Sequence, residues 1–351
     1  MKIKELFTIN QGIQITDEEI YYSNGKIPII TANNEIKGYG NKSIVKIEDL
    51  PCLTYPTKAF TGKIFVQDDL FSANNTAILI LNKKYFQEIN LKYISIFLSK
   101  ILIKHLSSEN AVNYIGKNVL KEIEIDYPFP TLKEQCKYVE KYEKILKIKK
   151  YIEEKITEID KILESKIKFE KYRIYKMNQI SLLNKGSNQI SEKMIYENYD
   201  NNGIPIFSSS TLNNGLMGKV SYECYKNFHK KGNKKELTWV TNGYAGKVFY
   251  RDTDFLYTEK CGRIVIRNEY IEKILPKFLC YILNQITYSY KTSESNNGKL
   301  DIIHMENVLV PIPINSNDEI DIDIQKKIIK EYEKLEFLKE KLTSILKEIE
   351  L

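Results

Sequence analysis

Residues 24–29, Asn-Gly-Lys-Ile-Pro-Ile, return at residues 202–206 as Asn-Gly-Ile-Pro-Ile. Further segments recur in the same order, and the offset between the two copies grows slowly along the chain. A coherent, growing offset indicates one ancestral unit with small loop insertions, and a repeat of this length indicates two domains rather than a solenoid. The further pairs are residues 53–55 with 237–239, 61–65 with 245–249, 71–80 with 255–266, 120–130 with 308–313, and 135–144 with 325–334.

The bulk composition fits two globular domains. A chain of 351 residues can form two sizeable cores, and 42% hydrophobic with 28% charged residues is ordinary for a soluble globular protein. The net charge of +7 is compatible with a polyanionic partner but does not establish one. The five cysteines are widely spaced without a Cys-x-x-Cys pair, which argues against disulfides and zinc and favours the cytoplasm. No signal-peptide core is present, and the longest apolar stretch, residues 93–103, is too short for a membrane span.

Each unit begins with a strand-rich segment. Apolar positions recur every three or four residues in residues 91–106 and 276–286, which predicts one amphipathic helix packed on each sheet. Strands are predicted for β-branched or apolar runs that are bounded by Asn, Gly, Pro or Asp. These runs are residues 27–31, 52–55, 62–66 and 76–81 in the first copy, and residues 204–208, 237–241, 246–250 and 262–266 in the second.

A charged, periodic segment ends each unit and predicts a coiled-coil helix. Thr131 and Glu134 have the spacing of a capping box at the start of the first helix. Roughly 40 helical residues would form a rod of about 60 Å, whose apolar stripe must be buried. Antiparallel pairing of the two helices within one chain is favoured, and a coiled coil between two chains is the alternative. The seam positions are Ile145, Ile148, Ile152, Ile156, Ile159 and Leu163 in the first helix, and Ile328, Tyr332, Leu335, Leu338, Leu342, Ile345 and Ile349 in the second.

The two domain exits resemble a known family, the specificity (S) subunits of type I restriction-modification systems. The resemblance covers essentially the whole chain, and its specificity comes from the same motifs occurring in the same order twice. The second exit departs from the pattern, because residues 318–323 form an acidic insertion and Ile324 stands where the first copy has Glu134. The exits are Gly116-Lys117-Asn118-Val119-Leu120 with Ile123, Ile125, Pro128, Pro130 and Glu134-Gln135, and Gly298-Lys299-Leu300 with Val308, Pro311, Pro313 and Gln325.

The resemblance implies an α+β fold with two mixed α/β target recognition domains, separated by a long antiparallel coiled coil with pseudo-twofold symmetry. The expected boundaries are a first recognition domain at 1–130, a central helix at 131–176, a second recognition domain at 177–315 and a C-terminal helix at 316–351.

The family also implies a division of labour. Each domain would read one half of a split site in double-stranded DNA, and the rod would set the gap between the halves. The rod would also dock two methyltransferase subunits, and restriction complexes add a translocating nuclease. S-adenosylmethionine is expected on the methyltransferase subunits, with no cofactor or metal on this chain. A related type II specificity chain is an alternative within the same resemblance.

Candidate DNA-binding residues lie on loops at matching positions of the two copies. Amide, hydroxyl, guanidinium and ammonium groups can read base edges or bind phosphates, whereas turn formation or a solvated surface is the competing interpretation for any one of them. The exchange of Lys58 and Phe60 for Asn242 and Tyr244 is what two different half-sites would require. The candidates are Asn33, Asn34, Lys37, Thr57, Lys58, Lys63, Asn113, Tyr114 and Lys117 in the first copy, and Ser209, Ser210, Asn213, Asn214, Asn242, Tyr244, Lys247, Arg251, Lys260, Arg263, Asn297 and Lys299 in the second.

The sequence shows no catalytic constellation. It contains no Asn/Asp-Pro-Pro-Tyr methyltransferase motif, no Walker loop and no convincing dinucleotide-binding glycine pattern, and its three His are scattered. Together with the resemblance, this absence leads us to expect a non-catalytic DNA specificity subunit of a methyltransferase or endonuclease complex. The alternative is a duplicated coiled-coil scaffold that binds protein or RNA.

Overall fold

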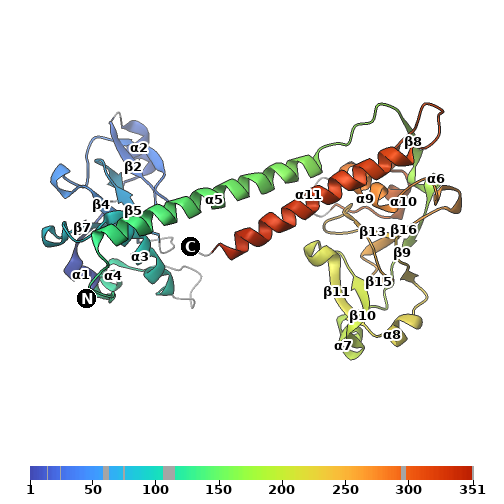
Figure 1. Ribbon diagram of the computed structural model, residues 1–351, viewed down its shortest axis with the longest axis horizontal. Coiled ribbons are helices and arrows are strands. Elements are labelled where there is room, and N and C mark those ends of the chain that lie inside the picture. The colour runs from blue at the N-terminus through green and yellow to red at the C-terminus, as the bar shows by residue number, and fades with distance from the viewer. Residues whose placement is uncertain are drawn as a thin grey trace. The chain divides into compact units, whose positions relative to one another are not determined.

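The structure is a computed structural model that describes residues 1–13, 15–23, 25–57, 63–73, 76–105, 115–293 and 298–349. It divides into two compact units, Met1–Lys150 and Tyr151–Glu350 (Figure 1). Each unit combines small β-sheets with helices, as predicted, and the long helix α5 (Leu132–Glu164) contributes residues to both.

The first unit contains two sheets. The larger sheet has the strand order β1-β7-β4-β5 with antiparallel neighbours, and in the smaller sheet, β3-β2-β6, strand β2 pairs antiparallel with β3 and parallel with β6. The strands are β1 (Phe7–Gln11), β2 (Ile27–Ile30), β3 (Ile36–Gly40), β4 (Cys52–Pro56), β5 (Phe65–Gln67), β6 (Ser72–Ala73) and β7 (Thr76–Leu81). The helices are α1 (Ile3–Leu6), α2 (Asp17–Tyr22), η1 (Ile47–Asp49), η2 (Lys83–Tyr85), α3 (Leu91–Lys104) and α4 (Lys117–Glu122).

The second unit repeats this topology. Its sheet β9-β16-β13-β14 matches β1-β7-β4-β5, and β10 pairs antiparallel with β11 and parallel with β15, as β2 pairs with β3 and β6. The strands are β8 (Tyr172–Lys176), β9 (Ser181–Lys185), β10 (Tyr199–Phe207), β11 (Leu216–Val220), β12 (Lys231–Gly232), β13 (Leu237–Val240), β14 (Val248–Tyr250), β15 (Phe255–Tyr257), β16 (Cys261–Ile266) and β17 (Leu309–Pro313). The helices are α6 (Met177–Ile180), α7 (Glu192–Glu197), η3 (Leu212–Gly215), α8 (Tyr222–Lys226), η4 (Asn268–Tyr270), α9 (Pro276–Ile286), η5 (Thr287–Tyr290), α10 (Ile302–Glu306) and α11 (Ile322–Glu348).

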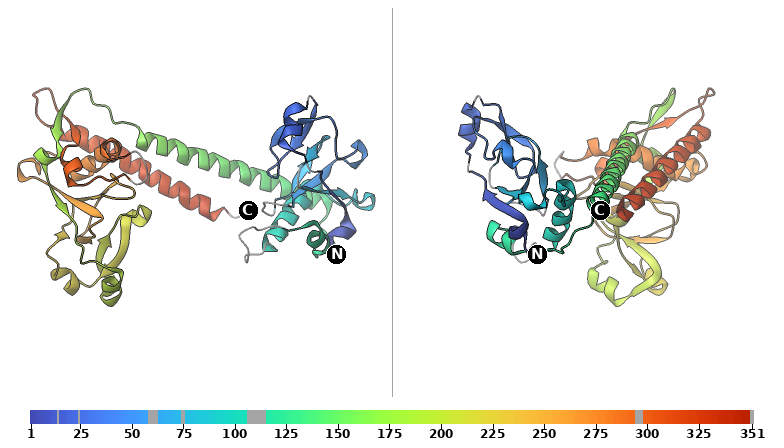
Figure 2. Two further views of the ribbon diagram at one scale, coloured as in Figure 1. Left: turned by 180° about the vertical axis from the view of Figure 1, so that it is seen from behind. Right: turned by 60° about the vertical axis from the view of Figure 1, so that its left-hand side comes forward.

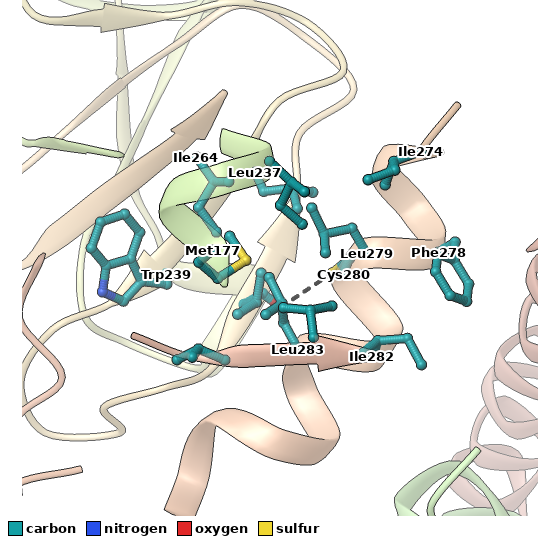
Figure 3. Packing of buried hydrophobic residues seen from close by; sticks show 14 of the residues in the cluster. Met177, Leu237, Trp239, Ile264, Ile274, Phe278, Leu279, Cys280, Ile282 and Leu283 are labelled. Carbon is teal, nitrogen blue, oxygen red and sulfur yellow. Dashed lines mark hydrogen bonds between the residues drawn. The ribbon is translucent and has the colours of Figure 1, made fainter. Parts of the chain in front are cut away.

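The amphipathic helices that the sequence predicts cover the larger sheets. In the first unit, Ile94 and Leu98 of α3 are buried in one cluster with Leu53 and Leu79 of the sheet. In the second unit, Phe278, Leu279 and Leu283 of α9 belong to a cluster with Trp239 and Ile264 (Figure 3). Burial of such side chains contributes about 1.5–3 kcal/mol each. The helix predicted at 276–286 has those bounds in the structure.

Trp239 shows why one glycine of the second core cannot be replaced. The Trp239 side chain is fully buried, and its Nε1 donates to the Leu300 carbonyl oxygen at 2.8 Å. A Cβ on Gly262 would lie 2.0 Å from the Trp239 ring. Gly262 is therefore required by the close approach of the ring to β16.

Each long helix is anchored to its own domain by a buried glutamine. The side chains of Gln135 and Gln325 are both 0% exposed. Gln135 Oε1 accepts from the Asn90 backbone N–H at 2.8 Å, and its Nε2 donates to the Glu88 and Pro130 carbonyl oxygens, each at 2.7 Å. These bonds join the start of α5 to the loop before α3.

The second anchor repeats the first at the start of α11. Gln325 Oε1 accepts from the Leu275 backbone N–H at 2.9 Å, and its Nε2 donates to the Lys273 carbonyl oxygen at 2.9 Å. Surface ion pairs also match, because Lys92 pairs with Glu143 in the first unit and Lys277 pairs with Glu333 in the second. The joint between domain and helix is therefore built the same way twice.

The capping box predicted at the start of α5 is confirmed. Thr131 N donates to Glu134 Oε2 at 2.9 Å, and Glu134 N donates to Thr131 Oγ1 at 3.4 Å. At the start of α11, Asp321 caps the helix by accepting from the Asp323 and Ile324 backbone N–H groups, each at 2.9 Å. The acidic insertion thus supplies a different cap.

The helix seam is buried only in part. Within the second unit, the last turns of α5 lie beside α11 with the opposite chain direction (Figures 1 and 2), and Asp160 pairs with Lys339. Ile152 and Ile159 are buried as predicted, whereas Ile148 is 54% exposed. The end of α5 and α11 therefore run antiparallel to each other within the second unit.

The predicted end of the central helix is wrong. The sequence analysis places the helix at 131–176, but α5 ends at Glu164, and Tyr172–Lys176 form strand β8 paired with β17. The apolar seam positions stop at Leu163, and the following Tyr-Arg-Ile-Tyr-Lys run suits a strand better than a helix. Among the described residues, nine strands lie outside the predicted runs: β1, β3, β6, β8, β9, β11, β12, β15 and β17.

Candidate DNA-binding interface

Two loops at matching positions carry the Asn-rich and Ser-rich candidates. The first loop, residues 31–35, joins β2 to β3, and the second loop, residues 208–215, joins β10 to β11. Asn34 has a φ of 64°, and Asn213 and Asn214 have φ values of 47° and 55°. Asn tolerates this left-handed region better than most residues, so its presence suits the tight path of both loops. Asn33, Lys37, Ser210, Asn213 and Asn214 are exposed, and Asn34 and Ser209 are half-buried.

Arg251 does not reach the surface, in contrast to the expectation that it contacts DNA. Its side chain is 3% exposed, and its guanidinium carbon lies 3.4 Å from the centre of the Phe207 ring. Nε donates to Thr238 Oγ1 at 2.9 Å, and Nη1 donates to the Asn214 carbonyl oxygen at 2.8 Å. Arg251 thus binds the backbone of the second loop from inside the domain.

Arg263 is also held inside the domain. It lies on β16, where its Nε and Nη2 donate to the two carboxylate oxygens of Glu236, each at 2.5 Å. Only 18% of the Arg263 side chain and 12% of the Glu236 side chain are exposed. A bidentate, largely dry ion pair of this kind leaves little freedom for reading a guanine edge. The sequence around Arg263 could not reveal this partner, because Glu236 lies just before β13, the strand that pairs with β16.

Three candidates converge on one cleft of the second unit. Asn242 follows β13, Lys260 precedes β16, and Lys299 precedes α10, yet all three line a cleft of about 520 Å³. Trp239 and Gly262 contribute to its lining beside them. The three side chains are exposed. One amide and two ammonium groups at a single concave surface can bind a base edge and the neighbouring phosphates.

The same cleft contains a lysine that sequence reasoning missed. Lys185, the last residue of β9, also lines it, together with the carboxylates Glu259 and Asp301. The Asp301 carboxylate contacts His304 Nδ1 at 2.8 Å and caps α10 by accepting from the His304 backbone N–H at 3.0 Å. The side-chain contact, followed by the backbone one, lowers the Asp301 pKa. The signal for Lys185 would have been recognition of β9 as the partner of β16.

Asn214 and Lys247 lie at a second, differently charged cavity. It has a volume of about 690 Å³ and lies between β14, α9 and the helices α5 and α11 of the second unit. Carboxylates of Asp160, Glu333 and Glu336 also line it. Glu333 pairs with Lys277, and Glu336 accepts from the Tyr281 hydroxyl at 2.9 Å. Phosphate binding by Lys247 would have to overcome this acidic surrounding.

Tyr244 is presented at a hairpin tip. Its side chain is 67% exposed, and it lies between Gly243 with a φ of 76° and Gly246 with a φ of 94°. Thr287 Oγ1 donates to the Gly246 carbonyl oxygen at 2.7 Å and holds the turn on the domain. An exposed aromatic ring on an anchored turn can stack on a sugar or a base.

The remaining candidates of the first unit are dispersed or lie outside the described residues. Lys63 is exposed, Lys117 is half-buried at the start of α4, and Thr57 is buried. Lys58, Asn113 and Tyr114 lie outside the described residues, as does Asn297 of the second unit. The structure therefore groups the candidates more clearly in the second unit than in the first.

The described residues contain neither a metal-binding group of side chains nor a membrane-spanning helix. Within them, no group of three or more His, Cys, Asp and Glu side chains is placed to hold a metal ion. None of the helices described combines the length and apolar character that a membrane crossing requires.

The chain matches a known family along most of its length. The sequence model of the type I restriction modification DNA specificity domain matches residues 1–161 and again residues 168–344. The two matches follow the two repeats, each with its domain and long helix.

Individual relatives agree with this assignment. A type I specificity subunit of Mycoplasma pneumoniae is 32% identical over 172 residues, which span 48% of this chain and 49% of that relative. A second type I specificity subunit of the same organism is 26% identical over 236 residues, spanning 64% of this chain and 80% of that relative. The first relative is thus matched over about half its length.

A crystal structure shares the fold. The type I restriction-modification S subunit from M. genitalium superposes with a TM-score of 0.59 at 16% identity, covering 99% of this chain and 91% of that chain. With two matches to the family model, a twice-built domain and an all-chain structural likeness, the chain belongs to the family of type I restriction-modification DNA specificity proteins.

Proposed function

We propose that this chain is a non-catalytic specificity subunit that reads a bipartite sequence in double-stranded DNA, one half with each unit. The observation that carries the proposal is the pair of matching loops. One scaffold presents Thr31-Ala32-Asn33-Asn34 in the first unit and Ser208-Ser209-Ser210-Thr211 in the second. Equal scaffolds with unequal loop residues suit two half-sites of different sequence. A duplicated scaffold without a restriction-modification role is not favoured by the family assignment.

The proposed contacts divide into two kinds. Asn33 and Asn213, which are exposed on the loops, can each form paired hydrogen bonds with an adenine edge. Lys185, Lys260 and Lys299 of the cleft would bind phosphates, position the second unit on the duplex and make affinity fall with salt.

The proposed partners follow from the name of the family. We propose that two methyltransferase subunits, which would carry S-adenosylmethionine, dock on the chain, and that restriction subunits join in a complex that also cleaves. The chain would act in the cytoplasm, where its target DNA and these subunits meet. The two anchored helices, joined to their domains by Gln135 and Gln325, would set the gap between the half-sites.

Exchange of residues 1–130 with those of a related specificity chain tests the proposal. The full-length chimera and the parent, each assembled with the methyltransferase encoded beside the parent, would methylate randomised duplexes that are then sequenced. We expect one half-site to change and the other to remain. If the parent protein shows no preference for a bipartite site, the proposed function is contradicted. If both half-sites change in the chimera, the units do not read DNA independently.

A further inference from the structure

Gln67 and Arg251 occupy the same place in the two units. Gln67, the last residue of β5, lies opposite Cys52 of β4, and Arg251, which follows β14, donates its backbone N–H to the Glu236 carbonyl oxygen before β13. Each side chain reaches a threonine of the central strand, Thr54 or Thr238. The two threonines are 2% and 0% exposed.

In the first unit this position connects the loop to the sheet through one amide group. Gln67 Nε2 donates to Asn34 Oδ1 at 2.5 Å and to Thr54 Oγ1 at 2.9 Å. Asn34 is the residue with a left-handed backbone in the first loop, and its backbone N–H donates to the Thr31 carbonyl oxygen at 3.0 Å. The orientation of the Asn34 side chain therefore depends on Gln67.

In the second unit, the guanidinium group of Arg251 connects a longer loop to the sheet. Arg251 Nε donates to Thr238 Oγ1 at 2.9 Å, and Nη1 donates to the Asn214 carbonyl oxygen at 2.8 Å. Asn214 belongs to three consecutive residues with positive φ, which end at Gly215 with a φ of 82°. The bond from Nη1 holds the carbonyl end of this strained turn.

Burial of the charged Arg251 guanidinium is energetically unfavourable. Arg251 is 3% exposed, no ion pair with a carboxylate is found for it among the described residues, and its Nη2 has no hydrogen-bond partner there. Burial lowers the pKa of Arg251 to about 10, so the group stays charged at neutral pH. A buried charge without a counter-ion is destabilising, and in some proteins such a group is retained because it fixes one conformation.

We propose that Gln67 and Arg251 are positioning residues for specificity: each fixes the loop of its own unit and thereby determines which base pairs that loop accepts. The inference rests on the proposed function, because it concerns the same loops. Neither residue touches DNA in this scheme. Both act through the loop asparagines, and the different donors in the two units hold loops of different length.

Arg251→Met tests the role of Arg251 in the full chain assembled with its methyltransferase. Met keeps the unbranched stem of the side chain but lacks the guanidinium group, so it removes every donor together with the charge over the Phe207 ring. Replacing a buried charge with an apolar side chain is often tolerated. Base preference would be measured by sequencing duplexes bound from a randomised double-stranded DNA library. We expect preference to broaden at least tenfold at one half-site, with the other half-site unchanged and the melting temperature close to that of the parent.

Gln67→Met is the reciprocal experiment, and it should broaden the opposite half-site. Thr238→Val removes only the acceptor of Arg251 Nε and should reproduce Arg251→Met in weaker form. The matched controls are Arg267→Met and Gln87→Met, which replace the same residue types away from the two loops. They should leave both half-sites unchanged.

The outcomes separate the inference from the function on which it rests. If the parent binds a bipartite site and folded Arg251→Met and Thr238→Val keep its preference, the positioning role is refuted while the function stands. If the variants lose preference at both half-sites equally, the effect is not confined to one loop, and the inference is again refuted. If the parent itself prefers no bipartite site, the proposed function fails first.

Discussion

Individual buried side chains decide how the domains hold their helices. Gln135 satisfies one backbone N–H and two carbonyl oxygens in the first unit, and Gln325 satisfies one of each in the second. An apolar residue at either position would leave these backbone groups buried without partners, which is more costly than losing an exposed hydrogen bond.

Gln135→Leu should lower the free energy of unfolding of the first unit by about 2–4 kcal/mol, and Gln325→Leu should cost the second unit somewhat less, because fewer groups lose partners. Urea unfolding followed by circular dichroism measures both. Trp239, the single tryptophan, reports the second unit alone by fluorescence. Exposed Gln87→Leu is the control and should change stability by less than about 0.5 kcal/mol. Equal, small effects of all three substitutions would show that the anchors are not needed.

The cysteines provide a second test at this scale. Burial raises the pKa of the Cys52, Cys261 and Cys280 thiols to about 12, so these groups are protonated and inaccessible at pH 8. Cys136 is exposed on α5. Iodoacetamide at pH 8 should therefore label Cys136 and spare Cys52, Cys261 and Cys280, as mass spectrometry of the folded protein would show; the half-buried Cys224 is not part of the comparison. Labelling of the three buried cysteines should appear only on unfolding or as the pH approaches 12, and rapid labelling of Cys261 at pH 8 would contradict the described core.

At the scale of elements, strand ends bring together groups that the sequence separates. Lys185 ends β9, Lys260 precedes β16 and Lys299 precedes α10, and all three line one cleft. Adjacent placement of β9, β16 and β13 in the sheet brings the end of β9 to the start of β16. Lys299 is held beside them because the Leu300 backbone N–H donates to the Thr241 carbonyl oxygen at 3.0 Å, just after β13.

If these lysines bind phosphates, each should contribute to the salt dependence of DNA binding. Single Lys→Ala substitutions at Lys185, Lys260 and Lys299 should each reduce the slope of log affinity against log salt concentration by about 1, and weaken binding about equally for all sequences. Lys326→Ala is the control, because Lys326 lies at the start of α11 and pairs with Asp323. Fluorescence anisotropy with a labelled duplex at several salt concentrations measures the slope. An unchanged slope for all three variants would remove the cleft from the interface.

The sequence predicted the elements well where their pattern is local. Thr76–Leu81 and Pro276–Ile286 have the predicted bounds, because an apolar run bounded by turn residues and three-to-four spacing on a helix are properties of neighbouring residues. It missed β8, whose partner β17 lies more than a hundred residues away. It also extended the central helix to 176, because the segment contains no Gly or Pro. Absence of these residues does not by itself continue a helix, and α5 ends at Glu164.

At the scale of the whole molecule, the duplication explains both the fold and the proposed reading of two half-sites. The two units share one topology. In the proposal, the length of the helices that connect them sets the gap between the half-sites. A heptad insertion keeps the phase of the apolar seam while adding about 10 Å of helix.

Insertion of seven residues after Ile152 in α5 should therefore lengthen the unread gap by about three base pairs, at about 3.4 Å per base pair. Both half-site sequences should be retained. The measurement is sequencing of duplexes bound from a library with randomised gap length. A three-residue insertion at the same place, which shifts the seam to another face, is the control and should weaken binding instead. An unchanged gap in the heptad variant would show that the helices do not act as a spacer.

The candidate site was predicted in kind but not in detail. Its loops and its Asn, Ser and Lys residues could be named, because turn residues and repeat positions are visible in the sequence. Arg251 and Arg263 were expected to contact DNA, because a guanidinium group can read a guanine edge, but Phe207 and Glu236 enclose them. Both partners are distant in sequence from the residue they cover.

The amino-acid sequence by itself determined the duplication, the strands within the predicted apolar runs, the two amphipathic helices, the cap at Thr131 and the family resemblance. Each of these is encoded by residue order or by the spacing of neighbouring side chains. Only the tertiary structure decided that Asn242, Lys260 and Lys299 share a cleft, and that Gln67 and Arg251 lie behind the loops. The physical reason is that burial and convergence depend on which strands pair across long stretches of chain, and a local pattern does not contain that pairing.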